Sequence, residues 1–157
     1  MNVTVIHVGA FKEEYLSAAQ AEYEKRLTPY CNFRSVLVKE EKLLNEEPVQ
    51  TKKALEIEGE RILKTLPKGA YIVALCVEGK DYTSEGFARL LGECALHCRD
   101  VAFIIGSSHG LSERVKEAAS ERLSFSRLTF PHQLLRVMLG EQIYRGFTII
   151  NGKKYHK

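Results

Sequence analysis

Apolar and polar positions along this chain follow two spacings, and these predict its elements. Five short, mainly apolar segments are typical of β-strands, namely residues 3–8, 33–38, 71–77, 101–105 and 122–125. Between and after them apolar residues recur at helical spacing, so we expect helices over 12–27, 50–66, 84–98, 112–120 and 131–147. We expect Ser84 and Ser112 to be N-caps, and Pro131 suits a first helical turn.

Two of these helices have readable apolar faces. The first repeats Tyr15, Ala19, Tyr23 and Leu27 on one side. The second has a similar face over residues 50–66 with one polar exception, Glu58. Both patterns predict amphipathic helices that pack on a core.

The alternation of strands and helices predicts an α/β fold, in which a parallel sheet is covered by helices on both faces. The segments AYIVALCV and VAFIIG are nearly continuous apolar runs, as central strands of such sheets are. No repeat or flexible linker divides the 157 residues, so we expect a single domain over 1–157. Ligands of such sheets bind beyond the carboxyl ends of the strands. The loops after Leu75 and Ile105 are therefore the places to search.

Composition indicates the compartment and the kind of partner. The four cysteines lack the spacing of a disulfide framework, no basic segment precedes the first apolar run, and no run is long enough for a bilayer, so we expect a cytoplasmic protein without a membrane partner. Residues 122–157 hold seven basic side chains against one acidic, whereas residues 1–121 hold 16 against 19. This basic end favours a polyanionic partner, although a solvated tail would account for it equally well.

Two short cysteine and histidine patterns do not amount to a metal site. Cys94 and Cys98 lie one helical turn apart on an apolar face beside His97, and no second ligand pair exists. Structural zinc needs four ligands. The sequence therefore predicts buried thiols and no metal.

The loop GSSHG, residues 106–110, is the main candidate for chemistry. No Walker A motif is present and Gly9 is not followed by GxGxxG, which disfavours a Rossmann dinucleotide site. The loop itself matches GxSxG, the nucleophile elbow of serine hydrolases, with Ser108 as nucleophile. Against that interpretation, Gly110 and Leu111 separate Ser108 from the next helix, and no aspartate follows Ser108. A hydrolase remains the alternative to a ligand-binding turn.

Further motifs carry a resemblance to a known family. The strand ending in VGAFK, the block VALCVEGKDYTSEGFA, the loop FIIGSSHGLSE, TFPHQLLRV, EQIYRGF and the terminal YHK together resemble the RlmH (YbeA-like) family of SPOUT, or α/β-knot, methyltransferases. The likeness covers essentially the whole chain. Ser107 departs from it, since the family usually has glycine there, and Gly140 and Gly146 stand where the family prefers better helix formers.

The resemblance implies a homodimer with a C-terminal trefoil knot that binds S-adenosylmethionine and methylates N3 of a pseudouridine in helix 69 of 23S ribosomal RNA, on the assembled ribosome. Carried over by position, the cofactor contacts would be Leu75, Gly106, Phe125, Ser126, Arg127, Leu128, Thr129 and Phe130. Apolar members of this set could equally be core residues.

Residues near the C-terminus are candidates for catalysis and RNA binding. His132, at a helix start that favours neutral imidazole, could accept a proton or simply pack. Arg145 and His156 are further catalytic candidates, although Arg145 could instead pair with Glu141 one helical turn away. A dimer that placed the tail over the partner's cofactor would share each active site. The expected RNA contacts are Arg136, Lys153, Lys154, Tyr155 and Lys157, which a non-catalytic RNA-binding protein would also need.

Overall fold

The computed structural model describes residues 1–97 and 100–157, and the expected strands and helices are all present with ends that differ by a few residues. In chain order they are β1 (Asn2–Val8), α1 (Glu14–Leu27), β2 (Asn32–Val38), α2 (Pro48–Thr65), β3 (Tyr71–Asp81), α3 (Ser84–Leu96), β4 (Val101–Ile105), α4 (Glu113–Ala118), β5 (Glu121–Ser124) and α5 (His132–Ile150).

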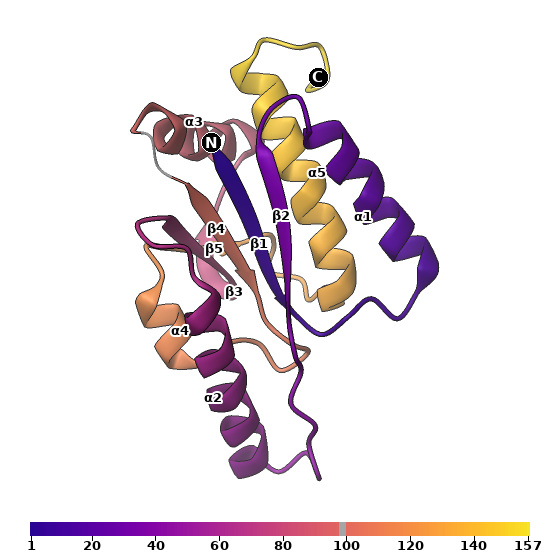
Figure 1. Ribbon diagram of the computed structural model, residues 1–157, viewed down its shortest axis with the longest axis vertical. Helices are drawn as coiled ribbons and strands as arrows, with labels where there is room; N and C mark the ends of the chain where they lie inside the picture. Colours follow the sequence, from indigo (N-terminus) through magenta and orange to yellow (C-terminus); the bar gives the residue numbers. More distant parts are fainter. Residues whose placement is uncertain (98–99) are drawn as a thin grey trace.

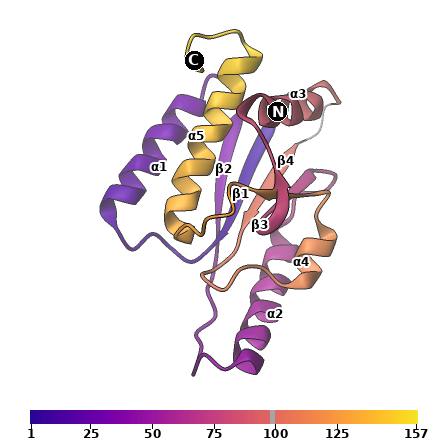
Figure 2. The same ribbon diagram turned by 180° about the vertical axis from the view of Figure 1, so that it is seen from behind.

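The five strands form one parallel sheet in the order β2-β1-β4-β3-β5. Parallel neighbours need long crossover connections, and helices supply them here. Helices α1, α3 and α5 cover one face and α2 and α4 the other (Figures 1 and 2). The predicted α/β fold is confirmed, while the trefoil knot stays a prediction. Within the described chain, no helix has both the length and the apolar character needed to cross a bilayer.

The side chains of the central strand β4 point alternately into the two halves of the core, one on each face of the sheet. Val101, Phe103 and Ile105 face the layer of α1, α3 and α5, whereas Ala102 and Ile104 face α2 and α4. All five are at most 2% exposed. A strand buried on both faces has no place for polar side chains, which explains its unbroken apolar sequence.

Helix ends differ from the expectation in detail. Thr83, rather than Ser84, is the N-cap of α3, and its hydroxyl accepts the Gly86 N–H at 3.0 Å. Ser112 stands at the N-cap position of α4, but its side chain makes no capping bond. Pro131 is the residue before α5, and that helix continues to Ile150.

The expected apolar face of α1 is only partly buried. Leu27 is fully buried, but Tyr15 at the other end of the helix is 69% exposed. Gln20 is buried instead, because α5 packs against the side of α1 that carries Gln20 and Tyr23, near Gly140. The exposed Tyr15 is therefore free for a contact outside this chain.

Candidate active site

A cleft of about 610 Å³ lies at the carboxyl ends of β4 and β5, beside the middle of β3. Its walls come from the middle of β3, the loop after β4, and the run between β5 and α5. This size is within the ~300–1,000 Å³ of typical small-molecule sites. Seven of the eight expected cofactor positions line it, namely Leu75, Gly106, Phe125, Ser126, Leu128, Thr129 and Phe130. Arg127 is exposed and lies outside the lining.

The wall from the middle of β3 depends on a break in the ladder that this strand forms with β5. The register with β5 shifts between Leu75 and Lys80, which both pair with Leu123. The intervening residues therefore leave the ladder, and Cys76 and Val77 line the cleft. The strand pairs with β5 again from Lys80. A Cβ on Gly79 would lie 2.5 Å from the Leu123 backbone, so only glycine allows β3 to come back this close to β5.

The wall after β4 is the tight turn of residues 106–110. The Gly110 N–H donates to the Ser107 carbonyl at 3.0 Å, and Gly110 has φ +92°. A Cβ on Gly106 would lie 2.0 Å from the Gly110 carbonyl oxygen. Gly106 is thus required for closure of the turn, whereas the sequence suggested only a close approach to the ligand.

The geometry around Ser108 does not support a hydrolase. Its side chain is exposed, and α4 begins only at Glu113. Over residues 1–97 and 100–157, no hydrogen bond links its hydroxyl to a histidine or a carboxylate. A serine nucleophile needs such a base within reach.

Serine side chains also order the run between β5 and α5. The Ser124 hydroxyl donates to the Ser126 carbonyl at 3.1 Å, and the Ser126 hydroxyl accepts the Leu128 N–H at 3.0 Å. Leu128 is 71% exposed even though it lines the cleft. An exposed leucine on a preformed turn gives the cleft an apolar rim that a ligand can cover.

His132 is the first residue of α5 and lines the cleft. Burial lowers its pKa, Arg136 one turn further along lowers it again, and so does Lys12, while Glu40 acts in the opposite direction. The imidazole is therefore neutral near pH 7 and able to accept a proton.

Arg136 was expected to contact RNA, but it is only 2% exposed. Its guanidinium lies over the Phe11 ring at 4.1 Å, and Nη1 donates to His7 Nδ1 at 2.9 Å. Burial lowers the pKa of Arg136 to about 10, and burial together with Arg136 lowers the pKa of His7 to about 4. Arg136 therefore has no surface from which to contact a phosphate in this chain.

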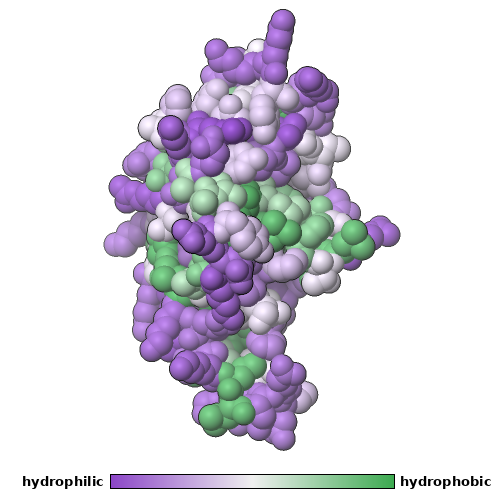
Figure 3. Space-filling model, turned by 90° about the vertical axis from the view of Figure 1, so that its right-hand side faces the viewer, coloured by the Kyte–Doolittle hydropathy of each residue, from purple (hydrophilic) through white to green (hydrophobic). Residues whose placement is uncertain are grey.

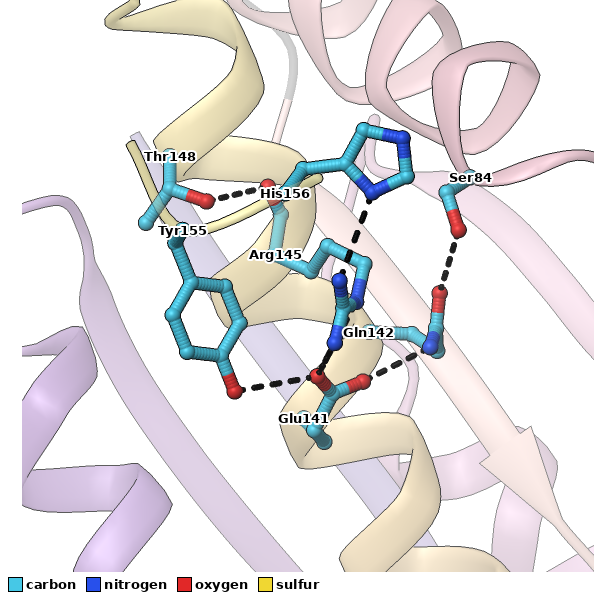
Figure 4. Close-up of polar contacts among 7 residues, drawn as sticks. All are labelled: Ser84, Glu141, Gln142, Arg145, Thr148, Tyr155 and His156. Atoms are coloured by element: carbon cyan, nitrogen blue, oxygen red, sulfur yellow. Dashed lines mark hydrogen bonds and ion pairs between the residues drawn. The ribbon is translucent and has the colours of Figure 1, made fainter. Parts of the chain in front are cut away.

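The other two catalytic candidates belong to a cluster at the C-terminal end of α5 (Figure 4). Glu141 Oε1 accepts bonds from Arg145 Nε at 3.0 Å and from the Tyr155 hydroxyl at 3.1 Å. Arg145 Nη1 donates to His156 Nδ1 at 3.3 Å, and His156 Nε2 lies 2.9 Å from Glu85 Oε1. Because arginine can only donate, His156 Nδ1 must accept and Nε2 carries the proton.

The contacts of this cluster show how Arg145 and the C-terminal tail are held within the chain. The pair of Arg145 with Glu141, first considered as the alternative to a functional role of Arg145, is present. The tail residue Tyr155 was expected only as an RNA contact, but its ring also packs edge-on against Tyr144 with centroids 4.9 Å apart. It does so because the chain turns back after α5 and the tail lies on the helix.

The predicted site residues therefore gather at two places. His132 is at the first residue of α5 and Arg145 is near its last turn. At the rise of about 1.5 Å per residue they lie about 20 Å apart along the helix. Lys153, Lys154 and Lys157 are exposed beside the second place. One chain alone does not bring both groups to one ligand.

Sequence reasoning assigned no role to Glu58, which the structure connects to the cleft. Its Oε2 accepts the Ser107 hydroxyl at 2.9 Å. The signal was its polar character on an otherwise apolar helix face. Among the described residues, no three His, Cys, Asp or Glu side chains converge as metal ligands, and Cys98 lies outside those residues.

Known proteins resemble the chain over its whole length. It is 48% identical over 160 residues to a protein of Methanococcus maripaludis and 45% identical over 159 residues to proteins of Clostridium botulinum and Ligilactobacillus salivarius, with complete coverage of every chain. The second and third of these are named ribosomal RNA large subunit methyltransferase H.

The fold comparison agrees. A crystal structure from Bordetella pertussis Tohama I, described as a probable methyltransferase, superposes with a TM-score of 0.59 at 14% identity and covers 92% of this chain and 93% of its own. The model of a family described as "Predicted SPOUT methyltransferase" matches residues 1–156. The chain belongs to the SPOUT methyltransferase family.

Proposed function

We propose that this enzyme methylates ribosomal RNA of the large subunit with S-adenosylmethionine as donor, works as a homodimer, and modifies N3 of a pseudouridine in helix 69. The names of the full-length relatives support the ribosomal RNA substrate. The base and the helix come from the family resemblance of the motifs quoted above.

The observation that carries the proposal is the cleft at the carboxyl ends of β4 and β5, beside the middle of β3. Its lining combines apolar side chains such as Leu75, Phe125 and Leu128 with the backbone of the 106–110 turn. Apolar walls suit an adenine ring, and main-chain groups can bind its polar edge. When bound, S-adenosylmethionine supplies a methyl group activated by a sulfonium.

The protein then has to orient the acceptor nitrogen and remove its proton. Positioning alone can supply a large part of such an acceleration, because a displacement at carbon depends on alignment. The N3 position of a uracil ring carries a weakly acidic proton. His132 lines the cleft in neutral form, so we assign it as the proton acceptor.

A homodimer would complete the site. The face on the α1 and α5 side of the molecule carries a band of hydrophobic residues across its middle, bordered by hydrophilic ones (Figure 3). Tyr15 of α1 and Leu134 of α5 are 69% and 37% exposed. Apolar patches of this kind mark interaction surfaces. A second copy packed there would bring its Arg145, Tyr155 and His156 toward the first cleft.

The exposed basic residues of the tail would then contact RNA near the cofactor. Lys153, Lys154 and Lys157 can neutralise phosphates, and Tyr155 can stack on a base. Such contacts position the RNA without reading its sequence.

The deciding experiment is methylation of ribosomes from a strain that lacks the enzyme. Purified protein and S-adenosylmethionine should add one methyl group to helix 69, detected by mass spectrometry of the RNA, on assembled subunits more than on free RNA. Salt-sensitive RNA binding without cofactor binding in calorimetry would instead indicate a non-catalytic RNA-binding protein.

A further inference from the structure

Glu58 is a buried carboxylate in α2 that the reaction itself does not use. It is 3% exposed. Its Oε1 accepts the backbone N–H of Glu41 at 2.9 Å, and its Oε2 accepts the Ser107 hydroxyl at 2.9 Å. A buried charge is costly unless hydrogen bonds satisfy it, and here each oxygen has a donor.

Ser107 connects this carboxylate to the cleft. It lies in the turn 106–110 that forms one wall, and it is itself only 5% exposed. The bond from the Gly110 N–H to the Ser107 carbonyl closes the turn on itself. The Ser107 side chain, in contrast, ties the turn to α2 on the opposite layer from α5.

We propose that Glu58 is a positioning residue for the cofactor, which by accepting the Ser107 hydroxyl holds the 106–110 turn in the conformation that forms the cleft wall. This inference rests on the proposed function, since it assigns a part in binding the methyl donor. Glu58 acts through Ser107 and does not touch the ligand. Its second bond, to Glu41, fixes the carboxylate in the orientation that Ser107 requires.

The surroundings of Glu58 make this tie sensitive to pH. Burial raises its pKa most, and Glu40 raises it further, while the bonds from Glu41 and Ser107 and the charge of His109 act in the opposite direction. A protonated carboxyl can keep both contacts only by donating its proton to the Ser107 oxygen, which replaces a charge-assisted hydrogen bond with a weaker neutral one. The tie therefore weakens as the pH falls through the raised pKa of Glu58.

The other side chains near Glu58 do not neutralise the charge of its carboxylate. Arg61 on the same helix is engaged elsewhere, with the Glu41 carboxylate at 2.6 Å and the Lys39 carbonyl at 2.9 Å. Helix α4 approaches α2 near Gly59 through the uncharged Ser112 and Val115. A raised pKa also means that the ionised form destabilises the fold at neutral pH, because the folded chain holds the proton more tightly than the unfolded chain.

Three variants and one control test the proposal by calorimetry with S-adenosylmethionine over acidic to neutral pH. In Glu58→Gln the carbonyl can accept the Glu41 N–H and the amide can donate to the Ser107 oxygen, so affinity should stay within about threefold of wild type and lose its decline at acidic pH. Glu58→Leu and Ser107→Ala remove the tie and should bind on the order of tenfold more weakly. Glu60→Gln, at an exposed pair with Arg114 3.7 Å away, is the matched control and should bind as wild type does.

Thermal unfolding of the free proteins separates positioning from stability. At neutral pH Glu58→Gln should unfold at the wild-type temperature or above it, because the buried charge is gone. Wild-type affinity in Ser107→Ala, or an acidic decline in Glu58→Gln equal to that of wild type, would overturn the inference. If Glu58→Leu does not fold, Ser107→Ala decides. No binding by the wild-type chain would instead overturn the proposed function.

Discussion

At the scale of single residues, the chemistry of His132 depends on Arg136. Burial and the arginine charge both lower the pKa of His132, so the histidine stays neutral to lower pH than a free imidazole would. Since only the neutral form accepts a proton, activity should fall as the pH drops through that lowered pKa.

Arg136→Met should move this acid limb to higher pH. The substitution removes the charge next to His132, and the pKa of the histidine should rise toward the ordinary imidazole value of 6.5. A pH profile of methylation together with NMR titration of His132 checks this. His132→Gln serves as the control, because its pH profile should lack the acidic fall in activity. If the acidic fall in Arg136→Met lies at the same pH as in wild type, a group other than His132 causes it.

Gly106→Val should abolish cofactor binding for a different reason. A Cβ there would lie 2.0 Å from the Gly110 carbonyl, so the turn must open before the cofactor arrives. Calorimetry should detect no binding, while Ala118→Val on the exposed surface of α4 retains it. Normal affinity in Gly106→Val would remove the 106–110 turn from the site.

Most cleft residues were expected, because the loop after Ile105 follows a central strand and the family resemblance placed the others by position. The sequence could not predict the pairs that decide their chemistry. Arg136 and His7 are 129 residues apart in the chain, and Ser107 and Glu58 are 49 apart. No local pattern encodes such contacts, and for that reason Arg136 was assigned to the surface.

At the scale of elements, the two glycines of α5 are explained by its neighbours. The helix packs between α1 and α3, and a Cβ on Gly140 would lie 3.3 Å from Tyr23 Cβ. On Gly146 it would lie 2.8 Å from Leu91 Cδ1. Close helix approach thus outweighs the cost of about 1 kcal/mol that each glycine brings to a helix.

Gly146→Val should therefore destabilise the fold by about 1–3 kcal/mol through overpacking against α3. Gly92→Ala is the control, because its Cβ would meet nothing nearer than Ile150 at 3.8 Å, and it should stabilise by up to about 1 kcal/mol. Urea unfolding of both variants measures the two effects. Equal stability of Gly146→Val and wild type would show that α3 can move away freely.

Element types were predictable from periodicity, but the length of β3 was not. The strand was expected to end at residue 77 and continues to Asp81, because it rejoins β5 after a register shift at Leu75 and Lys80. That shift depends on pairing with a strand about 50 residues away in sequence, and on Gly79. The wall of the cleft is a consequence of this non-local pairing.

At the scale of the whole molecule, His132 and the tail cluster are too far apart to act on one ligand within one chain. His132 and Arg145 lie about 20 Å apart along α5. A homodimer with two-fold symmetry places the same surface of each copy against the other, so the tail of one chain can reach the cleft of its partner.

Mixed dimers of His132→Ala and His156→Ala test this arrangement. Each variant alone should be inactive in methylation while His156→Ala still binds the cofactor. When subunits exchange at random, half of the dimers contain one copy of each, and if the tail acts on the partner's cleft, one of their two sites has an intact His132 and an intact His156. Activity should then return to roughly one quarter of the wild-type value, by the arithmetic of a two-fold symmetric dimer. If the tail served its own cleft, every site in the mixture would lack one histidine and no activity would return.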